Sequence, residues 1–190
     1  MQVLVRRCAD GAELRGRIVE TEAYLGGEDK ASHSAGGKHT KRNTAMFMKP
    51  GTIYVYPIYG IYLCMNVSSE GEGAAVLLRS LEPLQGQPVM RQLRTARRKE
   101  GARELKDKEL CNGPSKLCQA LDIPRCFDRR DLASDPEVLV IATATLRKFN
   151  LVSLRLPEFG HRLCLLANSP NLLLVDMPHY DLGTPFWIVS

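Results

Sequence analysis

Six side chains in the first half of the chain could together bind a flat heterocycle and hydrolyse a bond beside it. They supply one carboxylate, two aromatic rings, an imidazole, an amide and a cation: Glu22, Tyr24, His33, Tyr56, Asn66 and Arg79. Two aromatic rings can sandwich a planar base, and histidine and asparagine can read the polar edges of its ring. A carboxylate can orient and deprotonate a water molecule. This set of residue types therefore suits hydrolysis next to an aromatic ring system.

Each of these residues also has an ordinary structural explanation. A carboxylate such as Glu22 near a strand end is usually solvated, and a lone histidine in a polar loop is usually exposed. Tyrosines such as Tyr56, Tyr59 and Tyr62 more often pack across strands than bind a ligand. The basic segment 94–108 is more often a solvated helix face than a phosphate clamp. Residue type and position alone favour the structural explanations.

Alternating hydrophobicity predicts the strands that would position these side chains. Val3 and Val5 have the every-other-residue spacing of a strand, residues 14–24 have it again, and Asp10-Gly11 between them is a hairpin turn signal. Because side chains two apart on a strand point the same way, Glu22 and Tyr24 should share one face. The first two strands are therefore expected to form a hairpin that carries part of the site.

A long loop and a second hairpin follow. Residues 26–42 are rich in Gly, Ser, Lys and His and lack periodicity, which predicts an ordered loop of the kind that carries function. Pro50-Gly51 then turns the chain into a strand over 52–56, and Tyr59-Gly60 separates it from a strand over 61–67. A further strand is expected over 75–81, ending before Glu82-Pro83.

Two helices and two apolar strands complete the expected elements. Residues 88–98 have helical spacing, and a second helix opens at Asn112-Gly113-Pro114-Ser115. Residues 122–131 are expected to form a loop. The apolar runs 138–141 and 163–166 suggest buried strands.

Composition fits one globular domain over residues 1–190. The chain has 44% hydrophobic residues and a formal net charge of +5, which permits a polyanionic partner. No stretch approaches the roughly 20 apolar residues of a membrane-spanning helix, and no signal peptide opens the chain, so we expect no membrane partner. The six cysteines are scattered and lack the spacing of a zinc site or a disulfide framework. Reduced thiols in an intracellular compartment are expected.

Longer stretches of the sequence are far more specific than any single residue. They are Arg15-Gly16-Arg17-Ile18-Val19-Glu20-Thr21-Glu22-Ala23-Tyr24-Leu25, Ala31-Ser32-His33-Ser34, Thr40-Lys41-Arg42-Asn43, Met46-Phe47-Met48-Lys49-Pro50-Gly51-Thr52-Ile53-Tyr54-Val55-Tyr56, Tyr59-Gly60-Ile61-Tyr62, Cys64-Met65-Asn66, Leu77-Leu78-Arg79 and Leu110-Cys111-Asn112-Gly113-Pro114-Ser115-Lys116-Leu117. In this order they closely resemble the alkyladenine DNA glycosylase family, also called the 3-methyladenine or N-methylpurine DNA glycosylases. The resemblance covers residues 2–131 as a family-like core and leaves residues 135–190 as a divergent tail.

The resemblance implies a fold and a catalytic pair. The fold is an α+β domain with a curled, mixed but mainly antiparallel, open-barrel-like sheet, flanking helices and a protruding hairpin. Glu22 would be the general base that activates water for attack on C1′ of the deoxyribose, and Arg79 would help to hold that water. Cationic bases such as 3-methyladenine and 7-methylguanine leave with little protonation, whereas neutral hypoxanthine and ethenoadenine need more help.

The resemblance also implies a base pocket and an intercalating residue. The pocket would contain Tyr24, Ala31, His33, Tyr56 and Asn66. Backbone groups near Ala31 and His33 would meet the purine edge, and the Asn66 side chain would clash with the 2-amino group of normal guanine. Tyr59 would enter the minor groove and fill the space of the flipped nucleotide.

The implied partner is double-stranded DNA that contains damaged purines, bound by a monomer. Basic residues of the loop and of segment 94–108 would contact phosphates. No lysine matches a nucleophile position, so a monofunctional glycosylase that leaves an abasic site is expected, with no cofactor and no metal. The expected compartment is the nucleus, with the mitochondrion as a second site.

Both ends of the chain depart from the family pattern. The family carries a helix and strand residues ahead of the position of Gln2, and after about Asp135 its closing Gly-rich segment and aromatic strand are not found. Asn168-Ser169-Pro170 and Phe186-Trp187 are poor substitutes. A backbone carbonyl of that segment helps to position the water in the family. A truncated or variant relative that binds damaged DNA without catalysis is therefore the alternative, and a non-catalytic nucleic-acid-binding module is a third possibility.

Overall fold

The computed structural model describes residues 2–142, 161–166 and 173–178. Its strands are β1 (Gln2–Arg7), β2 (Glu13–Tyr24), β3 (Ile53–Ile58), β4 (Tyr62–Ser68), β5 (Ala75–Gln85), β6 (Val138–Ala142), β7 (His161–Leu166) and β8 (Leu173–Pro178). Its α-helices are α1 (Gln87–Thr95) and α2 (Pro114–Ala120), and short 3₁₀ helices cover Ala35–Gly37, Thr44–Phe47, Asp107–Glu109 and Arg125–Phe127.

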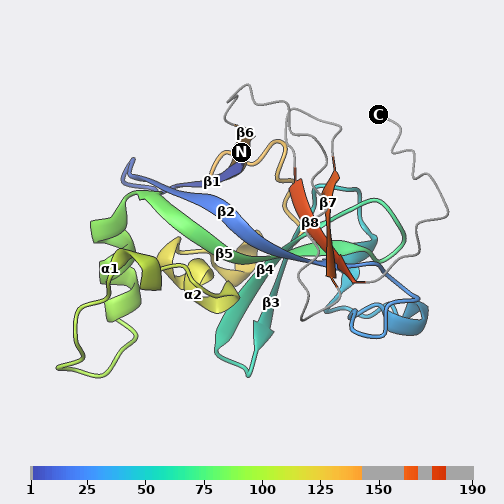
Figure 1. Cartoon of the computed structure of the whole chain (residues 1–190), viewed down its shortest axis with the longest axis horizontal. Coiled ribbons are helices and arrows are strands. Elements are labelled where there is room, and N and C mark those ends of the chain that lie inside the picture. Colours follow the sequence, from blue (N-terminus) through green and yellow to red (C-terminus); the bar gives the residue numbers. More distant parts are fainter. Residues whose placement is uncertain (1, 143–160, 167–172, 179–190) are drawn as a thin grey trace.

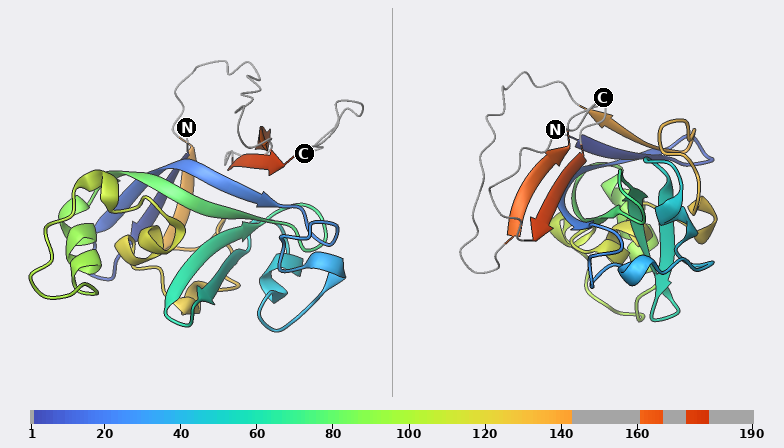
Figure 2. Two further views of the ribbon diagram at one scale, coloured as in Figure 1. Left: turned by 60° about the horizontal axis from the view of Figure 1, so that its bottom comes forward. Right: turned by 90° about the vertical axis from the view of Figure 1, so that its right-hand side faces the viewer.

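Six of the described strands form one sheet in the order β3-β4-β5-β2-β1-β6, and each neighbouring pair is antiparallel. The sheet curls, the helices α1 and α2 lie against its concave side, and the β3–β4 hairpin projects from it (Figure 1). The same arrangement is visible from two further directions (Figure 2). The expected α+β domain with a curled, mainly antiparallel sheet is confirmed, although the described strands include no parallel pair that would make the sheet mixed. Strands β7 and β8 pair with each other in a separate two-stranded sheet.

The β3 strand separates two hydrophobic clusters because its side chains alternate between the two faces of the sheet. Ile53 and Val55 belong to the larger cluster, which includes Leu117 and Leu121 of the α2 region. Tyr54 and Tyr56 belong to a smaller cluster on the other face. Full burial of one such apolar side chain stabilises the fold by about 1.5–3 kcal/mol. The larger cluster thus fixes the sheet, and the smaller one supports the face that carries the candidate site.

Both expected hairpins are present. Val3 pairs with Arg17 in the first, and Tyr56 pairs with Cys64 in the second. The expected strand over 163–166 lies within β7, and its burial lies outside what the structure describes. The sequences Asn168-Ser169-Pro170 and Phe186-Trp187 also lie outside the described residues. Within the described residues, no helix has the length and apolarity needed to cross a membrane.

Several element boundaries differ from those expected. β5 does not stop before Glu82 and Pro83 but runs to Gln85, because β4 pairs only with its first residues and leaves the proline on an unpaired edge. α1 ends at Thr95, earlier than expected, and β8 was not foreseen. β6 was expected to be buried throughout, but Val138 and Val140 are buried while Leu139 and Ile141 are partly exposed.

Candidate active site

The candidate base and its cationic neighbour come from adjacent strands. Glu22 near the end of β2 pairs with Leu77 of β5, and Arg79 lies two residues further along β5. Arg79 Nη1 is 2.9 Å from Glu22 Oε1, and both side chains are a little under two-fifths exposed. Solvent can therefore reach the ion pair, as a hydrolytic water must.

A bulge in the β2–β5 pairing presents Arg79. Glu20 pairs with Ser80 and Thr21 pairs with Leu78, so Arg79 is the residue without an opposite partner. Bulges of this kind redirect side chains and often lie beside active sites. The alternation of hydrophobic and polar residues gave no signal for this bulge. It did correctly predict that Glu22 and Tyr24 lie on one face of the strand.

Tyr24 is connected directly to the candidate base. Its hydroxyl donates a hydrogen bond of 2.7 Å to Glu22 Oε2. Burial, and then the hydrogen bond to Glu22, raise the pKa of Tyr24 far above its usual range, so the phenol keeps its proton. Each oxygen of the Glu22 carboxylate thus has its own donor, Arg79 on one side and Tyr24 on the other.

A pocket of about 40 Å³ lies beside this carboxylate. Its lining contains all five residues expected in the base pocket, together with two that were not expected: Tyr24, Ala31, His33, Tyr56 and Asn66, with Met46 and Tyr54. The sheet explains the grouping, since Tyr54, Asn66, Leu77 and Glu22 form a continuous row of paired residues across four strands.

Tyr54 was missed by the sequence reasoning although a signal existed. It lies two residues before Tyr56 on β3 and therefore faces the same side of the sheet. Its hydroxyl lies 2.8 Å from His33 Nδ1, and burial raises its pKa to about 12. The rings of Tyr54 and Tyr56 have centroids 5.1 Å apart. Met46 gave no signal, because the non-periodic segment that carries it does not fix the direction of its side chain.

His33 packs against these rings, and its surroundings disfavour the charged form of the imidazole. Its ring meets Tyr56 edge-on with centroids 4.6 Å apart. Burial, and then the positive charge of Arg42, lower the pKa of His33. In the tautomer whose Nδ1 accepts a hydrogen bond from the Tyr54 hydroxyl, the ring proton lies on Nε2 and can be donated to a ligand.

The backbone of the His33 loop is fixed by buried polar contacts. The buried Ser34 hydroxyl donates to the carbonyl of Gly73 at 2.6 Å, and the buried Asn43 amide donates to the carbonyl of His33 at 3.0 Å. The Ala31 N–H donates to Asp29 at 2.9 Å and is therefore already used. No acceptor within the described residues is bonded to the His33 N–H, which leaves this donor available to the edge of a ligand.

Asn66 is buried, and its amide nitrogen donates to the Tyr54 carbonyl at 3.2 Å. This hydrogen bond to the neighbouring strand fixes the side chain in the pocket wall. A fixed amide is a suitable steric gate, because it cannot rotate away from an intruding group without losing its partner. The gate role itself remains a prediction.

Tyr59 lies apart from the pocket, at the tip of the β3–β4 hairpin (Figures 1 and 2). It is 87% exposed, and positive φ angles of 51° at Tyr59 and 76° at Gly60 form the tight turn. Ile61 and Tyr62 beside it are also exposed. An exposed apolar tip on a projecting hairpin is suited to insertion into a partner.

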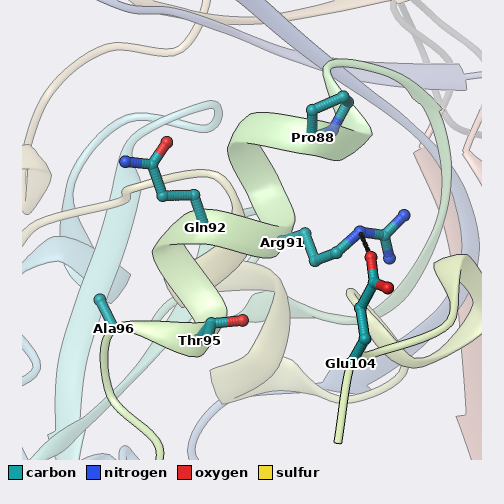
Figure 3. A pocket seen from close by; sticks show the side chains of 6 residues that line it. All are labelled: Pro88, Arg91, Gln92, Thr95, Ala96 and Glu104. Carbon is teal, nitrogen blue, oxygen red and sulfur yellow. Dashed lines mark ion pairs between the residues drawn. The ribbon is translucent and has the colours of Figure 1, made fainter.

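A wider hollow of about 540 Å³ on α1 has a different character. It is lined by Pro88, Arg91, Gln92, Thr95, Ala96 and Glu104, and Figure 3 shows Arg91 turned toward Glu104. These two side chains form an ion pair of 3.0 Å. The hollow offers no aromatic platform and no unpaired carboxylate. Across the described ranges, no cluster of His, Cys, Asp or Glu could hold a metal ion.

Known proteins match most of the chain. A model of the methylpurine-DNA glycosylase family matches residues 2–155, which extends past residue 131, where the motif resemblance ended. The chain is 70% identical over 138 residues to DNA-3-methyladenine glycosylase of Mus musculus and 69% identical over 138 residues to that of Homo sapiens. It is also 44% identical over 154 residues to a putative 3-methyladenine DNA glycosylase of Clostridium perfringens strain 13.

The extent of these matches differs between relatives. The mouse and human alignments cover 72% of this chain but 41% and 46% of those proteins, so the chain spans less than half the length of these relatives. The Clostridium perfringens alignment covers 80% of this chain and 75% of that protein. The family match also includes every residue of the site described above. The chain therefore belongs to the methylpurine-DNA glycosylase family.

Proposed function

We propose that this chain is a monofunctional DNA glycosylase that hydrolyses the N-glycosidic bond of alkylated or deaminated purines in duplex DNA. The observation that carries the proposal is the solvent-accessible carboxylate of Glu22, held between Arg79 and Tyr24 at the side of an aromatic pocket. Family membership supports the same reaction class.

The proposed chemistry requires one water and one carboxylate. Glu22 takes a proton from the water, whose oxygen forms a bond to C1′ of the deoxyribose. The glycosidic bond breaks, and its electron pair leaves with the purine. Arg79 holds one oxygen of the carboxylate through an ion pair, and Tyr24 holds the other through a hydrogen bond, so that little reorganisation is needed during the reaction.

The pocket supports an extruded purine as substrate. The rings of Tyr24, His33 and Tyr56 offer stacking surfaces, and the free N–H of His33 can meet the purine edge. Extrusion of a base costs a few kcal/mol in lost stacking. Tyr59 at the hairpin tip would offset part of this cost by filling the space in the duplex. Substrates in this proposal are 3-methyladenine, 7-methylguanine, hypoxanthine and ethenoadenine.

The absence of lysine from the pocket lining supports a hydrolytic product. The residues that line the described pocket supply no primary amine, so no Schiff base with C1′ is expected. The enzyme should therefore leave an abasic site and an unbroken strand.

A single-turnover excision assay tests the proposal. The chain and its Glu22→Gln variant are compared on a duplex with one hypoxanthine or one ethenoadenine. Loss of the general base should slow excision by at least about 100-fold while binding to the lesion duplex is retained. Glu82→Gln is the matched control, because Glu82 forms a similar exposed strand ion pair, 3.0 Å from Arg17, outside the pocket.

The outcomes separate the candidate functions. Equal excision by the chain and by Glu22→Gln would refute the assignment of the base. If neither protein excises but both prefer lesion DNA, the chain is a variant relative that binds damage without catalysis. If neither prefers lesion DNA over undamaged DNA, the pocket is not a site for an extruded base.

A further inference from the structure

Arg42 occupies one face of an aromatic ring that lines the pocket. The guanidinium carbon lies 5.0 Å from the centroid of Tyr56, and Nη2 lies 3.5 Å from the carbonyl oxygen of Pro57. The side chain is exposed, and no carboxylate forms an ion pair with it in the part of the chain that the structure describes. The positive charge of Arg42 is therefore not neutralised by a neighbouring side chain.

The backbone on both sides of Arg42 is anchored. The buried Asn43 side chain donates to the Lys38 carbonyl at 2.8 Å and accepts from the Thr40 N–H at 2.7 Å. The Lys41 carbonyl accepts a hydrogen bond of 2.9 Å from Arg129. A side chain on so constrained a backbone loses less entropy when it stacks on a ring than one on a free loop. The contact with Tyr56 is thus a built feature of the site.

The charge of Arg42 reaches further into the pocket. It contributes, after burial, to the lowered pKa of His33, and it acts on the hydroxyl of Tyr54. Both side chains line the pocket with Tyr56. A base that stacks on Tyr56 must use the ring face that Arg42 leaves free or displace the guanidinium. In either case the base lies close to a fixed positive charge.

We propose that Arg42 is a specificity-determining residue that weakens the binding of positively charged alkylpurines relative to neutral purine lesions. This proposal rests on the proposed function, because it assumes that the pocket receives a purine. An electron-rich ring attracts a cationic base, but a ring that already bears a cation on one face attracts a second cation less. Direct repulsion between the two charges acts in the same direction.

Equilibrium binding tests the proposal without interference from hydrolysis. In a Glu22→Gln background, affinities are measured for duplexes that contain cationic 7-methylguanine, neutral hypoxanthine or undamaged guanine. Removal of the charge by Arg42→Gln should raise the affinity for 7-methylguanine relative to hypoxanthine by about two- to threefold, the repulsion expected for charges about 8 Å apart in a largely aqueous medium. The undamaged duplex corrects for general loss of DNA affinity.

Two control variants separate charge from other effects. Arg42→Lys keeps the charge and should leave the ratio of the two affinities close to that of the Glu22→Gln parent. Lys38→Gln removes one positive charge from the same loop without touching Tyr56, and it should weaken binding to all three duplexes equally. Arg42 is exposed, so loss of folding is not expected from its replacement.

Each possible result bears on the proposal. An unchanged ratio in Arg42→Gln, with weaker binding to all duplexes, would identify Arg42 as a phosphate contact and overturn the proposal. A ratio that moves equally in Arg42→Lys would assign the effect to shape instead of charge and would also overturn it. If the Glu22→Gln parent shows no preference for either lesion over guanine, the proposed function fails first, and the inference about Arg42 fails with it.

Discussion

At the scale of single residues, the main feature is a carboxylate whose two oxygens have different donors. Arg79 engages Glu22 Oε1 at 2.9 Å, and Tyr24 engages Oε2 at 2.7 Å. The arrangement fixes the plane of the carboxylate and leaves its remaining lone pairs for a water molecule. Tyr24 therefore has two tasks in the proposed reaction, since its ring lines the pocket while its hydroxyl orients the base.

Replacement of Tyr24 by phenylalanine should separate these two tasks. Tyr24→Phe keeps the ring, so affinity for a lesion duplex should change little. Loss of the hydrogen bond to a charged group removes about 1.5 kcal/mol or more, which corresponds to a decrease in excision rate of about tenfold. Single-turnover excision and equilibrium binding of a hypoxanthine duplex measure the two effects.

Tyr62→Phe serves as the matched control, because it removes a hydroxyl that has no hydrogen bond in the described part of the chain and keeps the 41% exposed ring at the hairpin tip. Its excision rate should stay within a factor of about two of the parent, as expected for an exposed replacement. An unchanged excision rate in Tyr24→Phe would mean that the hydroxyl does not orient the base. Weaker binding with an unchanged excision rate would mean that the Tyr24 hydroxyl contributes to binding of the lesion and not to the chemical step.

At the scale of elements, the loop between β2 and β3 depends on a glycine where it leaves β2. Gly26 has a φ of +95°, and a Cβ there would lie 2.3 Å from the carbonyl oxygen of Glu72. Only glycine avoids both the backbone strain and this collision. The loop that begins here carries Ala31 and His33 into the pocket, so its path is set by contact with the β4–β5 turn.

Gly26→Ala should therefore destabilise the fold and damage the pocket together. We expect a loss of about 2 kcal/mol or more in the free energy of unfolding, measured by urea denaturation, with weaker binding to lesion DNA. Gly36→Ala is the control, because Gly36 also has a positive φ, of +66°, but a Cβ there meets no atom within 4 Å. The free energy of unfolding should fall by about 1 kcal/mol in Gly36→Ala, because this replacement adds backbone strain but no collision. Equal losses in the two variants would show that the contact with Glu72 has no effect.

The elements also show which features can be predicted from sequence. Alternation located both hairpins and put Glu22 and Tyr24 on one face, because side-chain direction follows from strand period. The bulge that presents Arg79 and the length of β5 past Pro83 could not be found in this way, since both depend on which strand lies alongside. The hydrogen bond from Tyr24 to Glu22 was equally invisible, because periodicity assigns a face but not a contact.

At the scale of the whole molecule, three projecting segments lie on the same side of the sheet. The tip of the β3–β4 hairpin lies between the loop that follows α1 and the segment between β2 and β3, as Figure 1 and the left view of Figure 2 show. Both flanking segments are rich in basic residues, and the chain has a formal net charge of +5. An apolar tip between two basic loops fits a duplex whose phosphates meet the loops while the tip enters a groove.

Salt dependence tests whether the loop after α1 contacts DNA. Arg97 and Lys99 are exposed and form no ion pair within the described residues. If each contacts one phosphate, the double variant Arg97→Gln/Lys99→Gln should reduce the slope of log affinity against log salt by about 1.8 in magnitude, since each phosphate contact contributes about 0.9. Phosphate contacts carry no information about the base, so the preference for lesion over undamaged duplex should not change.

The control double variant Arg7→Gln/Arg15→Gln removes the same charge from two arginines that are already paired with Glu13, and it should alter the slope much less. Equal changes in the two double variants would mean that net charge alone governs binding and that the loop lies outside the DNA path.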